Sequence, residues 1–188
     1  AAPSVTPTLV TLAAGGFKQP QHLAALAFAL SLGSEFDAIV TLDGGPSLDE
    51  AIAIDMDDLD FVKGTSSRLR MGAELPRREM LRLALMASEN RAAAALGHSY
   101  PGGLEAFVDA MNGKAAVLDM NDSRFVEPTG LSPANVSTAG DLAKLVRAAH
   151  EYPLIREYST KNRATIRASG RPLAYGNTNG LVRSKYWD

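Results

Sequence analysis

The chain has 188 residues, of which 46% are hydrophobic and 21% charged, and its formal net charge at pH 7 is −2. This near-neutral charge would not gather nucleic acid, and no uninterrupted apolar run reaches the ~18 residues of a spanning helix, so we expect neither a nucleic-acid partner nor a membrane span. Because the chain has no cysteine, disulfides, thiolate catalysis and zinc–sulfur sites are excluded.

Short strands, one helix and an acidic turn are predicted in the first third of the chain. We expect a strand within residues 8–13, a helix over 22–31 and strand-like apolar alternation over 51–54. Four aspartates follow within residues 55–60, without the glycine and terminal glutamate of a calcium loop. We interpret them as a solvated acidic turn.

Helices dominate the middle of the chain. Apolar spacing and strong helix formers predict helices over 77–87, 91–96, 104–118 and 139–150, and a shorter helix that starts at Pro153. Pro76 stands where a helix can begin, because the first helical residue needs no N–H donor. Thr138, with Asp141 three residues later, resembles a capping box in which Asp replaces the usual Glu.

The last third of the chain changes character. Residues 163–168 alternate between apolar and polar side chains, Ser169 and Gly170 favour a turn, and residues 172–175 can pair back. This pattern predicts a β-hairpin.

Three polar residues, Ser88, Glu89 and Asn90, interrupt the apolar helical run LMASENRAA. Buried polar groups cost free energy unless they are hydrogen bonded, so this interruption needs a reason. One interpretation is that a helix ends here and Ser88 caps the next one, since Ser and Asn favour caps. The other is a break that directs two short polar side chains into an active site. The residues by themselves leave both interpretations open.

Several long stretches resemble one protein family. They are LPRREMLRLALMASENRAAAAL, the following YPGGLEAFVDAMNGKAAVLDM, and SRFVEPTGLSPANVSTAGDLAKLVRAAHEYPLIREYST. They resemble the low-molecular-mass penicillin-binding proteins, which are serine D-alanyl-D-alanine peptidases, and point to the D,D-endopeptidase subgroup. The resemblance runs over about residues 43–183, which is most of the chain.

The resemblance implies a fold and a function. The expected fold class is α/β (α+β), of the serine β-lactamase and DD-peptidase type, with a helix-rich lobe and an incomplete antiparallel sheet. We expect one such domain over residues 1–188, lacking the C-terminal sheet strands. The implied function is hydrolysis of D-Ala–D-Xaa bonds in peptidoglycan cross-links through an acyl-serine intermediate, in the periplasm of a Gram-negative bacterium. The implied partners are peptidoglycan stem peptides and β-lactam antibiotics, and no metal or organic cofactor is implied.

The family carries three motifs, Ser-x-x-Lys, Ser-x-Asn and Lys-Thr-Gly. The resemblance places Ser-x-Asn at Ser88 and Asn90, where the serine assists proton transfer and the asparagine holds the substrate backbone. Ser31 stands where the nucleophile is expected, but Ser34 replaces the lysine of that motif. Neither Ser-x-x-Lys nor Lys-Thr-Gly occurs anywhere in the sequence.

The two missing motifs leave three explanations open. In the first, the sequence is part of a longer one. In the second, the protein is a catalytically degenerate relative that binds peptidoglycan or a partner without cleavage. In the third, a partner chain or a second copy completes the sheet by strand addition.

Two further groups of residues carry side chains that can form sites. A Ser–His–Asp triad would use a histidine, but none accompanies a Gly-x-Ser-x-Gly elbow, so we interpret the histidines as surface or helix-end residues: His22, His98 and His150. A run of arginines favours a solvated helix face, with contact to an anionic glycan or a peptide carboxylate as the alternative. Its members are Arg68, Arg70, Arg77, Arg78 and Arg82.

Overall fold

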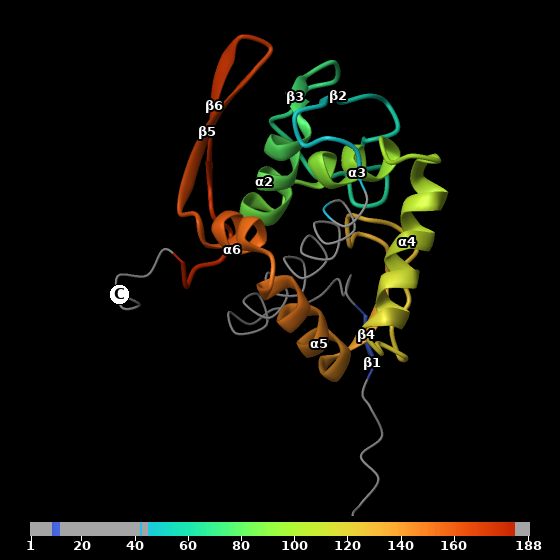
Figure 1. Cartoon of the computed structure of the whole chain (residues 1–188). Helices are drawn as coiled ribbons and strands as arrows, with labels where there is room; N and C mark the ends of the chain where they lie inside the picture. The colour runs from blue at the N-terminus through green and yellow to red at the C-terminus, as the bar shows by residue number, and fades with distance from the viewer. Residues whose placement is uncertain (1–8, 12–41, 43–44, 183–188) are drawn as a thin grey trace, which may run out of the picture.

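A computed structural model describes residues 9–11, 42 and 45–182 (Figure 1). Ser31, His22 and the helix predicted over 22–31 therefore lie outside the described residues. The strands are β1 (Leu9–Thr11), β2 (Ala51–Ala53), β3 (Glu74–Pro76), β4 (Val136–Thr138), β5 (Arg163–Ala168) and β6 (Arg171–Gly176). The described helices are α2 (Arg77–Ala87), α3 (Asn90–His98), α4 (Gly103–Val117), α5 (Ala139–His150) and α6 (Pro153–Thr160).

Helices α2 and α3 form the centre of the described structure. Figure 1 shows α4 on one side of them and the long β5–β6 hairpin on the other, in agreement with packing of α2 on α3, α6 and β6 and of α3 on α4. The side chains between them are apolar and fully buried, among them Met80, Leu83, Leu96 and Phe107. Among the described helices, none combines the length and apolarity needed to cross a membrane.

The strands form three separate antiparallel pairs in the described part of the chain, β1–β4, β2–β3 and β5–β6. The predicted hairpin is confirmed: Arg163 pairs with Gly176 and Ala168 with Arg171. Ser169 and Gly170 make its turn with φ of 50° and 75°, a conformation that suits a two-residue hairpin loop. These small antiparallel pairs agree with the predicted incomplete antiparallel sheet.

The helices predicted over 77–87 and 139–150 have the same bounds in the structure. Pro76 precedes α2, and the Thr138 hydroxyl accepts a hydrogen bond of 3.2 Å from the backbone N–H of Asp141, as the capping pattern predicts. Strands β3 and β4 were not predicted because, unlike β1 and β2, neither lies within a longer apolar run.

The interpretation of the aspartates as a solvated turn is wrong for Asp58. This side chain is only 3% exposed, and its Oδ1 lies 2.7 Å from Nδ1 of His98, the last residue of α3. The turn therefore anchors the chain before β3 to the end of α3. His98 and His150 do end helices, as expected.

The interpretation of the arginines as a solvated face is wrong for Arg77. Its side chain is 1% exposed and donates to Oε2 of Glu50 at 2.8 Å and to Oγ of Ser99 at 3.0 Å. Two others on the same helix also pair with carboxylates: Arg78 with Asp49 at the surface, and Arg82 with Glu79, where both side chains are partly buried. The arginines on α2 therefore serve the structure through ion pairs.

Candidate active site

The interruption after α2 is a sharp break between two helices. Ser88 ends α2 in the left-handed conformation, with φ 50° and ψ 46°. A residue other than glycine costs about 1–2 kcal/mol there and keeps that conformation only where its surroundings impose it. The break turns the chain so that α3 begins two residues later, at Asn90.

Glu89 is the N-cap of α3. Its side chain is 6% exposed, accepts the backbone N–H of Ala92 at 3.0 Å and also accepts the hydroxyl of Ser67. The interpretation that Ser88 caps the second helix is therefore wrong, because its neighbour holds that position. The same interpretation also required a helix to end at this point, and α2 does end here. Because Glu89 accepts the backbone N–H at the start of α3, the side chains of Ser88 and Asn90 are not needed for capping and can make other contacts.

Those two side chains face one hollow of ≈ 360 Å³. The Ser88 hydroxyl lies 3.1 Å from the hydroxyl of Thr178, and Nδ2 of Asn90 donates to Oγ1 of Thr65 at 3.1 Å. The hollow is also lined by residues of the loop before β3 and by Tyr175 of β6. The structure thus brings the two predicted residues Ser88 and Asn90 together, while Ser31 lies outside the described residues, and their catalytic roles stay a prediction.

Two contact residues, Thr178 and Thr65, were missed by the sequence analysis. Thr178 is 90 positions from Ser88 in sequence, and Thr65 is 25 positions from Asn90. Thr178 is held in place by its own N–H, which donates to the carbonyl of Met86 at 3.0 Å. No local pattern marks such residues, because their role depends on how β6 and the loop before β3 pack against the helix break.

Arg68 and Tyr175 form one wall of the hollow. The Arg68 guanidinium lies 3.8 Å from the centre of the Tyr175 ring and donates to the carbonyl of Ala174. Burial, together with the negative charge of Glu89, raises the pKa of Tyr175 to about 12. Its hydroxyl is buried and has no hydrogen-bond partner among the described residues. At neutral pH this wall therefore carries a protonated, uncharged phenol beside the Arg68 guanidinium.

The loop that carries Thr65 is organised by Asp60. Its carboxylate accepts three backbone N–H groups at 2.7 to 2.9 Å, those of Val62, Lys63 and Thr65. Partial burial by itself would raise the pKa of Asp60, but these hydrogen bonds and one from the Thr65 side chain outweigh it and lower the pKa to about 2. The ionised carboxylate therefore fixes the loop on which the contact to Asn90 depends.

The depressed pKa of Asp60 predicts a pH-dependent stability. The contribution of Asp60 to the free energy of unfolding is fully present above its usual pKa of 3.8 and is lost as the pH falls from there towards 2. In Asp60→Asn, the free energy of unfolding, measured by urea denaturation between pH 5 and 2, is expected to fall less steeply with acid than in the parent. A residual slope remains, because the pKa of Asp141 is lowered as well. Asp57→Asn, which removes an exposed carboxylate of the same turn, is the control with the parent slope, and equal slopes in Asp60→Asn and the parent would contradict the role of Asp60.

Comparisons with known proteins agree with this fold. A family model described as D-alanyl-D-alanine carboxypeptidase matches residues 48–188. The chain is 49% identical over 160 residues to a D-alanyl-D-alanine endopeptidase of Escherichia coli, covering 84% of this chain and 52% of that protein. It is 48% identical over 153 residues to the Pseudomonas aeruginosa protein of the same name, covering 80% and 49%. The chain thus spans about half the length of the curated relatives it matches.

Solved structures show the same relationship. The Streptomyces K15 DD-transpeptidase matches with a TM-score of 0.74 at 27% identity, over 83% of this chain and 66% of that one. A D-alanyl-D-alanine carboxypeptidase from Mycobacterium tuberculosis matches with a TM-score of 0.71 at 26% identity, over 84% and 60%. The fold is therefore that of the penicillin-binding DD-peptidases, as the sequence resemblance implied. The chain belongs to the D-alanyl-D-alanine carboxypeptidase family.

Proposed function

We propose that the protein is a serine-type DD-peptidase that cleaves peptidoglycan cross-links through an acyl-serine intermediate. The observation that carries this proposal is the pair Ser88 and Asn90, which line one hollow at a helix break inside the region that matches the family. Its substrates are the peptides of peptidoglycan, β-lactams acylate the same serine, and the protein works in the bacterial periplasm. The domain of residues 1–188 carries the helical side of this site.

The geometry supports a proton-transfer role for Ser88. A serine hydroxyl is a weak nucleophile and needs a neighbouring group to remove its proton. Ser88 and Thr178 already share a hydrogen bond of 3.1 Å, so the Ser88 hydroxyl can accept one proton while it donates another. In this proposal Ser31 is the nucleophile and Ser88 acts as a relay: it accepts the Ser31 proton and at the same time gives its own hydroxyl proton to the leaving amine nitrogen.

Asn90 is the group that holds the substrate backbone. Its amide can donate to a peptide carbonyl and accept from a peptide N–H. The hydrogen bond to Thr65 uses one of its two N–H donors and fixes the orientation of the side chain. The second N–H and the carbonyl oxygen then serve the peptide.

A second candidate function is a catalytically degenerate relative that binds peptidoglycan without cleavage. The observation in its favour is Ser34, which stands where the family carries the lysine of its first motif. A serine hydroxyl does not act as a base near neutral pH, so a hollow with Ser88 and Asn90 would then bind peptide only. The expectation that a partner or a second copy completes the sheet stays a prediction.

Benzylpenicillin separates the two candidates. The intact mass of the 188-residue chain is measured before and after incubation with the antibiotic, and the modified peptide is mapped. The DD-peptidase proposal expects a gain of one penicillin on the peptide that contains Ser31. An unchanged mass, with binding to purified peptidoglycan retained, would favour the degenerate relative.

Thr65 is expected to act as a positioning residue for Asn90. In Thr65→Val the side chain keeps its shape but loses the oxygen that accepts from Nδ2 of Asn90 and that also hydrogen bonds to Asp60. The rate of acylation by benzylpenicillin, followed by intact mass, is expected to fall about tenfold because the amide is no longer held in one orientation. Thr65→Ser retains the hydroxyl and should restore the rate. An unchanged rate in Thr65→Val would show that the contact does not position Asn90.

A further inference from the structure

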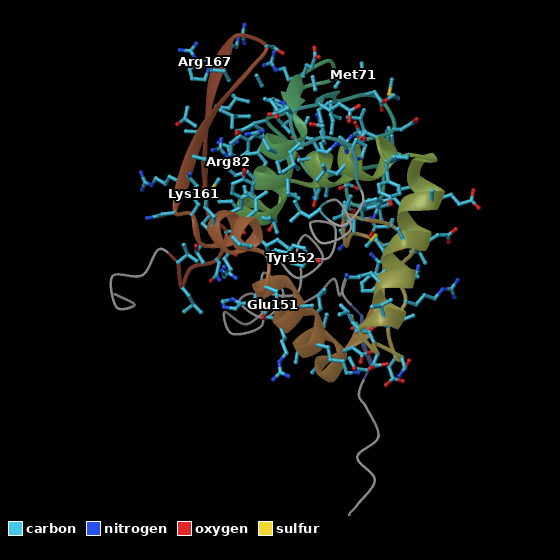
Figure 2. The ribbon with its side chains drawn as sticks, viewed as in Figure 1. Met71, Arg82, Glu151, Tyr152, Lys161 and Arg167 are labelled. Atoms are coloured by element: carbon cyan, nitrogen blue, oxygen red, sulfur yellow. The ribbon has the colours of Figure 1, made fainter. Side chains whose placement is uncertain are left out.

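A second hollow, of ≈ 490 Å³, lies beside the candidate active site. It is bounded by residues 67–73 on one side and by the tip of the β5–β6 hairpin on the other. Figure 2 labels one residue on each of these segments, Met71 and Arg167. The two hollows share Ser67 and Arg68. The two hollows are therefore neighbours that meet at these two residues.

The second hollow is lined by positive charge. Arg68 and Arg70 approach it from the loop, Arg171 approaches it from β6, and no Asp or Glu is among its lining residues. The three arginines form no ion pair with a carboxylate in the described part of the chain, whereas those of α2 do. Ser67 and Ser169 add hydroxyl groups to the same walls.

The arrangement of this hollow is fixed by Arg68. Its guanidinium donates to the carbonyl of Ala174 and stacks on the ring of Tyr175, which joins the loop to the hairpin. The exposed guanidinium groups of Arg70 and Arg171 are then left on opposite sides of one concave surface. Guanidinium groups match the planar, two-oxygen geometry of a carboxylate and bind it with two parallel hydrogen bonds.

We propose that this hollow is a subsite for a carboxylate-bearing segment of the peptide substrate. The substrate backbone lies at Ser88 and Asn90, and its carboxylate reaches Arg70 and Arg171 beyond Arg68. The inference rests on the proposed function, because it takes the ligand of the first hollow to be a peptide. It adds a specificity that the pair Ser88 and Asn90 does not supply, since neither residue carries a charge.

Two peptides that differ in one charge test the subsite. Both end in D-Ala–D-Ala, carry the same uncharged fluorophore and differ only in a Glu or a Gln upstream, and their affinities for the 188-residue chain are measured by fluorescence anisotropy at low salt. The Glu peptide is expected to bind more tightly, by up to about fivefold for each arginine that contacts it. This preference should shrink as salt is added, because salt screens exposed charges.

The variants assign the preference to the two arginines. The double variant Arg70→Gln/Arg171→Gln is expected to lose the preference for the Glu peptide and to keep its affinity for the Gln peptide. Arg70→Lys/Arg171→Lys should retain part of the preference, which shows that the loss does not come from misfolding. Arg147→Gln, which removes an exposed charge from α5, should behave as the parent. A Glu preference that survives in the double Gln variant, or an equal loss of both peptides, would overturn the subsite.

Two further measurements separate this inference from its alternatives. Poly-L-glutamate that binds in an Arg70- and Arg171-dependent manner, while the Glu peptide shows no preference, would make the surface a general polyanion site and overturn the proposal. Acylation of the parent chain by benzylpenicillin reports on the proposed function by itself. A preference for the Glu peptide that depends on the arginines, without a penicillin adduct, would support the subsite and contradict the peptidase proposal. A penicillin adduct without that preference would support the peptidase proposal and contradict the subsite.

Discussion

Replacing Ser88 by alanine is expected to slow acylation by benzylpenicillin by at least about a hundredfold, the lower end of the range for a positioned proton-transfer group. Alanine keeps the β-carbon and adopts the same left-handed backbone, so the helix break and the cap by Glu89 should persist. What is lost is the hydroxyl that lies 3.1 Å from Thr178. The time course of adduct formation, followed by intact mass, measures the effect.

The matched control for this variant is Ser159→Ala. That serine lies on α6, and its hydroxyl donates to a backbone carbonyl of its own helix, so its removal should leave the acylation rate at the parent value. Equal unfolding free energies of the two variants would show that both are folded. Acylation of Ser88→Ala at the parent rate would remove Ser88 from the mechanism.

The largest expected effect on stability belongs to Phe107. This side chain on α4 is fully buried and packs edge-on against Tyr100, with the ring centres 5.2 Å apart. Phe107→Ala is expected to lower the free energy of unfolding by about 3–5 kcal/mol, because it removes buried apolar surface and leaves a cavity between α3 and α4. Urea denaturation measures this value.

Phe61 provides a control of the same residue type. It is 77% exposed, so Phe61→Ala should change the unfolding free energy by no more than about 0.5 kcal/mol. Similar losses in the two variants would show that the packing of α4 against α3 does not stabilise the fold as described.

The helices were predictable because their signals are local. The bounds of α2 and α5 follow from Pro76, from the cap at Thr138 and from runs of strong helix formers. The β5–β6 hairpin was predictable for the same reason, since alternation and a Ser-Gly turn lie within fourteen consecutive residues, 163–176. Within these segments, local preference and tertiary packing favour the same structure.

The candidate site could be predicted only in part. The interruption at residues 88–90 showed where a helix breaks, but not that Glu89 caps α3 while Ser88 adopts a left-handed backbone. A serine in that conformation goes against local preference, and such violations concentrate at functional sites. The interpretation of Ser88 as a cap applied a sound local rule one residue too early.

The contacts that hold the charged side chains of the fold also depend on distant parts of the chain. The pairing of Asp58 with His98 spans 40 residues, and composition by itself made the acidic turn look solvated. The arginines show the same limit, because one run of similar residues contains the buried Arg77 and the exposed Arg70. Which of them pairs with a carboxylate is decided by the neighbours that folding brings, and not by their spacing.

We propose above that the hollow at Ser88 and Asn90 belongs to a serine DD-peptidase. The most direct measurement is incubation of the 188-residue chain with purified cross-linked peptidoglycan, followed by chromatography and mass analysis of the released muropeptides. Cross-linked dimers are expected to decrease and monomers with a free D-Ala carboxyl group to increase, and Ser88→Ala is expected to suppress this change. A chain that binds the peptidoglycan while the dimers remain intact would contradict it.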